Sequence, residues 1–83
     1  MKHIRSDYNR RIQDNDNLIP EDEPVFLLRG QDFLAPFLLE EYARRMRALG
    51  HGYISDMIRD HALNMLDWQD RHGCKIADCP KED

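Results

Sequence analysis

Two amphipathic helices are predicted within residues 31–73, which read QDFLAPFLLEEYARRMRALGHGYISDMIRDHALNMLDWQDRHG. In the first, over residues 31–49, apolar side chains recur at helical spacing and form a stripe of Leu38, Tyr42, Met46 and Leu49, which Leu39 and Ala43 widen. Pro36 suits a first helical turn, where its missing N–H costs nothing. Gly50 suits the C-terminal cap.

The second helix is expected to start at Ser55, whose hydroxyl suits an N-cap, and to run to about His72, with Gly73 closing it. Its predicted core face consists of Ile58, Ala62, Met65 and Leu66, with Ile54, Met57 and Trp68 beside it. Because the connection between the helices is short, they should pack as an antiparallel hairpin.

A continuous apolar run, Val25-Phe26-Leu27-Leu28, lies between Pro24 and Arg29. Its length and the turn residues around it predict a short strand with both faces covered. No other segment resembles a strand, so its backbone groups need a partner from elsewhere. Three solutions stay open: pairing with a second copy in a homodimer, packing as an extended segment against helices, or starting a helix.

The length and composition allow one small core. Of the 83 residues, 41% are apolar, and chains of this size gain stability from oligomerisation. The predicted fold is mainly α, an antiparallel helical hairpin with one short extended apolar segment, and it is expected to form a homo-oligomer. We expect a basic and polar N-terminal arm over residues 1–18, a single small helical domain over residues 19–80 and a tail over residues 81–83.

The net charge of −4 argues against a general nucleic-acid binder, which should be basic. No apolar run approaches the ~18 residues that span a bilayer. The first residues are polar and lack the apolar segment of a signal peptide. The sequence therefore predicts a cytoplasmic protein with no membrane partner, in which Cys74 and Cys79 are reduced by default.

A candidate ligand-binding turn lies where the apolar run ends, at Arg29-Gly30-Gln31-Asp32. Arg29 can clamp a phosphate or carboxylate, and Gly30 lets a ligand approach the backbone. Gln31 and Asp32 can read hydroxyls or base edges. A simpler interpretation stays open, in which Arg29 pairs with an acid such as Asp32 or Glu23, Gly30 makes the turn and Asp32 caps the helix.

Arg44, Arg45 and Arg47 form a second basic cluster on the first helix, in which Arg44 and Arg45 are the candidate site residues. Beside Glu40 and Glu41 they suit a solvated helix face, but in an oligomer they can add charge near Arg29 of another chain. Four zinc ligands can be chosen from the cysteines and histidines, but the close spacing of a structural zinc site is missing. No catalytic motif is found, so we expect no enzyme, no metal and no cofactor.

Residues 19–32, which read IPEDEPVFLLRGQD, together with Ala35-Pro36 resemble a segment of small phage and prophage proteins. Residues 65–73, with Ile76, Asp78 and Pro80, are similar to the C-terminal portion of those proteins. The resemblance covers less than half of the chain. It implies a small phage accessory protein acting in the host cytoplasm, and it carries no activity with it.

Small phage accessory proteins work by binding, which leaves two main hypotheses. The first is a counter-defence protein that sequesters an anionic nucleotide signal at a subunit interface through Arg29, Gln31 and Asp32. The second is an inhibitor or adaptor that contacts a host defence protein directly, with the acidic residues 14–23 and the basic arm as contact surfaces. A small structural protein of the particle is a third interpretation.

Overall fold

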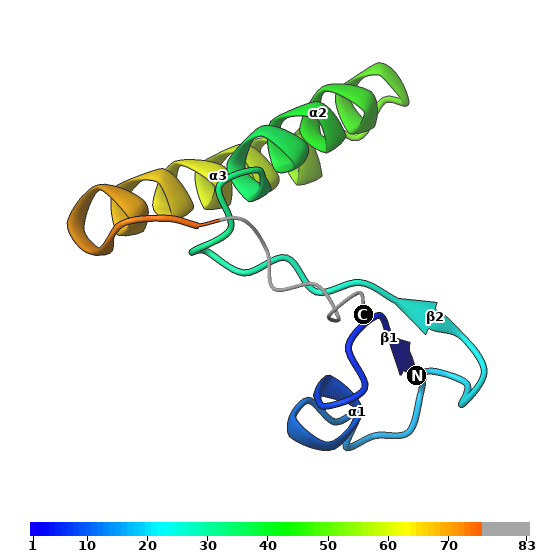
Figure 1. Cartoon of the computed structure of the whole chain (residues 1–83). Coiled ribbons are helices and arrows are strands. Elements are labelled where there is room, and N and C mark those ends of the chain that lie inside the picture. Colours follow the sequence, from blue (N-terminus) through cyan, green and yellow to red (C-terminus); the bar gives the residue numbers. More distant parts are fainter. Residues whose placement is uncertain (76–83) are drawn as a thin grey trace. The chain divides into compact units, whose positions relative to one another are not determined.

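The computed structural model describes residues 1–75 and shows a mainly helical chain, as predicted. Its elements are β1 (Lys2–His3), α1 (Tyr8–Arg11), β2 (Pro24–Val25), α2 (Ala35–Ala48) and α3 (Gly52–His72), as Figure 1 shows. The described chain divides into two compact units, residues 1–27 and residues 28–75. Within residues 1–75, no helix is long and apolar enough to cross a membrane.

The second unit consists of α2 and α3 packed together, with the turn that precedes α2. Most side chains buried in the helix pair are small or flexible: Ala35, Ala43, Ser55, Ala62 and Met65. Pro36 and Asp32 are also buried in this unit. Small side chains let two helix backbones approach closely, and this decides which side of each helix is buried. On α2 the buried side runs along the edge of the predicted stripe, at Ala43, whereas Leu38, Tyr42 and Leu49 are 49%, 58% and 73% exposed. On α3, Ala62 and Met65 of the predicted core face are buried, as predicted, and Leu66 is 42% exposed.

Several helix ends agree with the sequence. Pro36 lies in the first turn of α2, Gly50 follows its end with a φ of 91°, and Gly73 ends α3 with a φ of 85°. The start of α3 differs, because the helix begins at Gly52 rather than at Ser55. Ser55 is not a cap: its hydroxyl is buried inside the helix pair and donates a hydrogen bond to the carbonyl of Ala43 at 2.6 Å.

The turn before α2 explains why this helix starts at Ala35 and not near residue 31. The Asp32 carboxylate accepts a hydrogen bond from the Leu34 N–H at 2.9 Å, and the Asp32 carbonyl accepts one from the Ala35 N–H at 3.1 Å. Asp32 thus stabilises a separate turn that leads into the helix. The interpretation of Asp32 as the helix cap is wrong, because the N-cap of α2 is Leu34 and it has no side-chain cap hydrogen bond.

The first unit is built around Tyr8, which is 6% exposed. The guanidinium of Arg5 lies 4.5 Å from the centre of the Tyr8 ring, and His3 meets the same ring edge-on. Asp7 pairs with Arg5 at 2.7 Å and with Arg11 at 3.2 Å. Hydrogen bonds from Arg5 and then Arg11 hold the pKa of the Asp7 carboxyl below its ordinary value.

Only Val25 of the apolar run lies in a strand, and its partner belongs to the same chain. Phe26 and Leu27 are 58% and 36% exposed, so the prediction of a strand with both faces covered is wrong. β1 pairs with β2 in parallel, with Lys2 opposite Pro24 and His3 opposite Val25. The statement that no other segment can act as a strand is therefore wrong, and this pairing needs no second copy. A two-residue ladder uses backbone groups only, so Lys2 and His3 give no side-chain pattern that identifies them beforehand.

Candidate ligand pocket

The segment from Leu28 to Asp32 lies against α3 and is held there by Gln69. The Gln69 side-chain amide donates to the carbonyls of Gly30, at 2.9 Å, and Asp32, at 2.8 Å. Backbone hydrogen bonds with Lys75 hold the far side of this segment, from the Lys75 N–H to Gln31 at 2.9 Å and from the Phe33 N–H to Lys75 at 2.8 Å. The candidate turn is thus fixed before any ligand binds.

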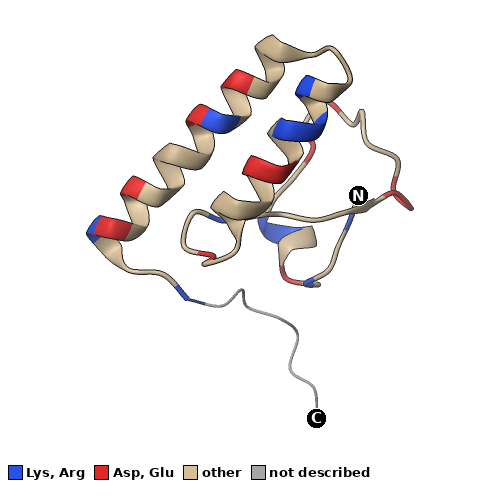
Figure 2. Ribbon diagram, turned by 90° about the horizontal axis from the view of Figure 1, so that it is seen from above, with Lys and Arg blue, Asp and Glu red and all other residues tan. Residues whose placement is uncertain are grey.

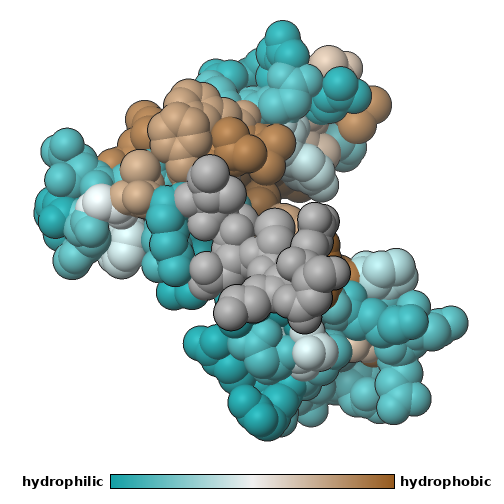
Figure 3. All heavy atoms as spheres, in the orientation of Figure 1, coloured by the Kyte–Doolittle hydropathy of each residue, from teal (hydrophilic) through white to brown (hydrophobic). Residues whose placement is uncertain are grey.

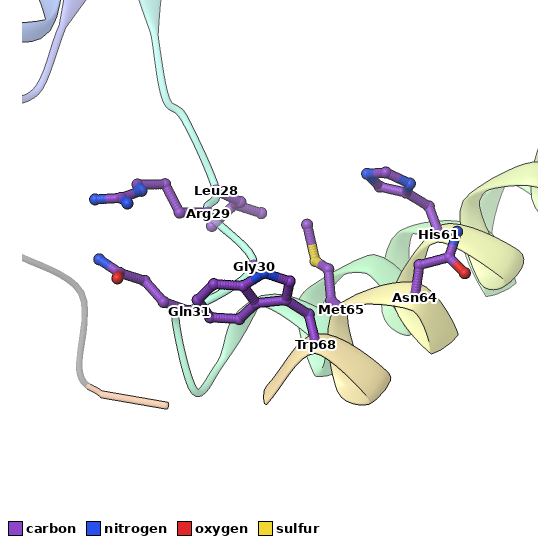
Figure 4. A pocket seen from close by; sticks show the side chains of 8 residues that line it. All are labelled: Leu28, Arg29, Gly30, Gln31, His61, Asn64, Met65 and Trp68. Carbon is purple, nitrogen blue, oxygen red and sulfur yellow. The ribbon is translucent and has the colours of Figure 1, made fainter. Parts of the chain in front are cut away.

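A hollow of about 370 Å³ lies between this segment and α3, as Figure 4 shows. The segment contributes Leu28, Arg29, Gly30 and Gln31, and α3 contributes His61, Asn64, Met65 and Trp68. The pocket therefore combines an apolar floor with hydrogen-bonding groups and one permanent positive charge. No acidic side chain of residues 1–75 lines it.

The indole of Trp68 gives the pocket a large flat surface. Trp68 is 38% exposed, and its ring stacks on the ring of His72 with centroids 4.5 Å apart and an interplanar angle of 28°. His72 lies one helical turn further along α3, so the stack restrains the indole from within the same helix. A flat aromatic side chain held in this way can stack on a planar ligand.

Arg29 and Gln31 present their polar ends in the same direction, away from α3 (Figure 4). Arg29 is exposed, and within residues 1–75 its guanidinium makes no hydrogen bond or ion pair. The expected pairing of Arg29 with Asp32 is therefore not made, because the Asp32 carboxylate is buried and bonded to the Leu34 N–H. Arg29 keeps its charge available to an anion.

The structure brings three of the six predicted site residues together in this pocket: Arg29, Gly30 and Gln31. Asp32 is 6% exposed and holds the turn beneath them. A Cβ added at Gly30 would lie 3.9 Å from the Met65 side chain, an ordinary contact, so packing on α3 does not itself require glycine there.

Arg44 and Arg45 do not line the pocket. Both pair with Glu41 on the exposed side of α2, where Arg45 Nε lies 2.9 Å from a Glu41 carboxylate oxygen. Hydrogen bonds from Arg45 and then Arg44 hold the pKa of the Glu41 carboxyl below its ordinary value. Their role as auxiliary charge for a ligand stays a prediction.

Sequence reasoning did not place four pocket residues of α3 in the site: His61, Asn64, Met65 and Trp68. They recur at i, i+3, i+4 and i+7, so they lie on one side of the helix. This spacing is visible in the sequence, but it also fits an ordinary core stripe. Only the position of residues 28–31 against the helix identifies it as a pocket wall.

The residues weighed as zinc ligands are not assembled in the part that the structure describes. Residues 1–75 contain no group of three or more histidine, cysteine or acidic side chains placed to hold a metal ion. Cys74 is exposed with a free thiol, and Cys79 lies outside the described residues.

No protein-family model matches the chain, and no curated protein and no solved structure matches it. The functional argument therefore depends on the pocket and on the surface of the helix pair.

Proposed function

We propose that this chain is a non-enzymatic binding protein that holds an anionic nucleotide in the Trp68 pocket. One observation carries the proposal: a fixed turn places a guanidinium, unpaired within residues 1–75, and a carboxamide, whose polar ends point away from α3, at the edge of a hollow that an exposed indole lines. A nucleotide needs these three groups, because its base stacks, its phosphate pairs with a cation and its base edge or ribose forms hydrogen bonds.

The role of each residue follows from its chemistry. Arg29 pairs with the phosphate through its planar fork of donors. Trp68 stacks on the base, which contributes about 1–3 kcal/mol in comparable sites. Gln31 and Asn64 donate and accept hydrogen bonds at the base edge or the ribose.

The biological part of the proposal rests on the resemblance to phage and prophage proteins. In that setting, the chain acts in the host cytoplasm and sequesters a nucleotide signal of host defence. We propose that it does so as a homo-oligomer of antiparallel helical hairpins, with the ligand at a subunit interface. Arg44 or Arg45 of another copy adds positive charge there.

The test is a fluorescence titration, because Trp68 is the single tryptophan of the chain and reports directly from the pocket. ADP-ribose and cyclic AMP are the probes, and adenosine and ribose 5-phosphate separate the contributions of base and phosphate. We expect saturable quenching, with the phosphorylated probes bound more tightly than adenosine.

Arg29→Ala should weaken binding of ADP-ribose roughly 10- to 100-fold, since it removes a charge-assisted hydrogen bond. Arg71→Ala is the matched control, because Arg71 is an exposed arginine of α3 that pairs with Asp67 at 3.1 Å and does not line the pocket. Arg45→Ala tests the auxiliary charge. Equal affinities of Arg29→Ala and Arg71→Ala would overturn the proposed role of Arg29, and no quenching by any probe would overturn nucleotide binding.

Direct contact with a host protein is the second candidate function. The acidic residues Glu21, Asp22 and Glu23 of this chain, which would form the contact surface, are all exposed in the first unit. In this case, changing the three acids to their amides should abolish capture of the partner, and salt should weaken it. Nucleotide binding should tolerate the same changes, so the two functions are distinguishable in one set of variants.

A further inference from the structure

Large apolar side chains are left uncovered on both helices, and five of them lie on one side of the helix pair. Leu38 and Tyr42 on α2 and Leu49 at its C-cap are 49%, 58% and 73% exposed, and Ile54 and Met57 on α3 are 43% and 57% exposed. We call these five residues the apolar face. Figure 3 shows apolar residues gathered over the helices of this unit.

The five side chains lie on one side of the helix pair, and the ion pairs that join α2 to α3 lie on the opposite side. The Arg59 guanidinium meets the Glu40 carboxylate at 2.8 Å, and Arg47 pairs with Asp56, so both pairs join α2 to α3. Acidic and basic residues recur along both helices in Figure 2.

Each residue of the apolar face is two positions from a member of these ion pairs. On α2, Leu38 and Tyr42 flank Glu40, and Leu49 follows Arg47. On α3, the same spacing relates Ile54 to Asp56 and Met57 to Arg59. Two positions correspond to about 200° around an α-helix, which puts the apolar face opposite the ion pairs.

The exposed area of this face suits a protein interface. Taking about 180 Å² for each such side chain when fully exposed, the five leave roughly 500 Å² uncovered. A standard interface buries about 800 Å² on each partner, of which roughly 60% is apolar, so its apolar part is also about 500 Å².

The chemistry of the face points to a second copy of the same chain as the occupant. The five residues carry no charge, and Arg45, which shares their side of α2 three residues after Tyr42, is paired with Glu41 of its own helix. Two copies related by a two-fold axis can therefore bring these apolar side chains together with each Arg45 paired within its own chain. The buried side chains within the helix pair are small, so the helices gain most of their apolar burial only when this face is covered.

We propose that the apolar face is the homodimer interface of this protein. This inference names the surface through which the proposed homo-oligomer forms. It rests on the self-association in the proposed function and not on nucleotide binding. The row of α3 side chains that starts at Ile54 and Met57 continues to Met65 and Trp68. The dimer therefore places each Trp68 pocket at the margin of the interface.

The test is the mass of the full chain in solution by sedimentation equilibrium. We expect a dimer of about twice the 9.9 kDa chain mass. Met57→Glu should raise the dimer dissociation constant by at least about 100-fold, since dimerisation would bury a charge. Leu63→Glu is the matched control: Leu63 is 59% exposed, lies seven residues after Asp56 and therefore shares its side of α3.

Isotope-filtered NMR on a mixture of labelled and unlabelled wild-type chains keeps the test valid if Met57→Glu fails to fold. Contacts from Tyr42 or Met57 to the other chain support the interface. A monomeric wild-type protein, whose face is then covered by another part of its own chain or by a different partner, would overturn it. Ligand titration is read separately, so a monomer that still binds nucleotide contradicts only the interface.

Discussion

The hydroxyl of Ser55 lies fully buried between α2 and α3 and has one acceptor, the carbonyl of Ala43. From the sequence, a serine before an apolar helix is read as a cap, because its oxygen can satisfy a free N–H of the first turn. Here the same group joins two helices. A small polar side chain serves this purpose because it allows close approach and still satisfies its own hydrogen-bonding capacity.

Replacing Ser55 with alanine removes this hydrogen bond while keeping the residue small. We expect the free energy of unfolding to fall by about 1–2 kcal/mol, measured by urea denaturation followed by circular dichroism. Ser6→Ala is the control, because Ser6 is exposed in the first unit. If both variants unfold at the same urea concentration as the wild type, the buried hydrogen bond contributes no net stability.

At the scale of elements, the connection between α2 and α3 depends on two glycines with different roles. Gly50 has a φ of 91°, in the region that L-residues with a side chain rarely adopt. Gly52 is the first residue of α3, and a Cβ added there would lie 3.4 Å from the flexible end of Arg47. The first glycine is required by the backbone, and the second is not.

Gly50→Ala should therefore destabilise the chain by about 1 kcal/mol or more, because alanine is strained at this φ. Gly52→Ala should be close to neutral and serves as the matched variant. Thermal unfolding of the two proteins at the same concentration tests this difference. A loss of stability in Gly52→Ala as large as in Gly50→Ala would contradict it.

For the whole molecule, the main feature is a helical unit that leaves large apolar side chains exposed while burying small ones. If the apolar face is the homodimer interface, dimerisation is linked to folding, and thermal stability depends on chain concentration by mass action.

The midpoint of thermal unfolding should then rise by about 3–6 °C for each tenfold increase in chain concentration. Scanning calorimetry over a concentration series measures this slope. Met57→Glu should show a much flatter slope, whereas Leu63→Glu should keep that of the wild type. A midpoint independent of concentration in the wild-type protein would show that folding does not depend on self-association.

Only the residues that precede α2 could be predicted as part of the candidate site from the sequence. Arg29, Gly30 and Gln31 are predicted as site residues because they form a turn between an apolar run and a helix, and this pattern is recognisable from neighbouring residues alone. His61, Asn64 and Trp68 lie thirty or more positions further along the chain, and their spacing on α3 also fits an ordinary core stripe. The hydrogen bonds of Gln69 to Gly30 and Asp32 bring the two parts together.

The sequence by itself determined that this chain is mainly helical and where α2 and α3 end, because helical periodicity, Pro36, Gly50 and Gly73 act on their nearest neighbours. Tertiary structure decided which part of the apolar stripe on α2 is buried, that Lys2 and His3 pair with β2, and that Arg29 and Trp68 both line one pocket. The physical reason is the distance along the chain over which each interaction acts. Apolar periodicity shows that a helix needs a covered side, whereas close packing through Ala43, Ser55 and Ala62 selects that side only when the second helix is present.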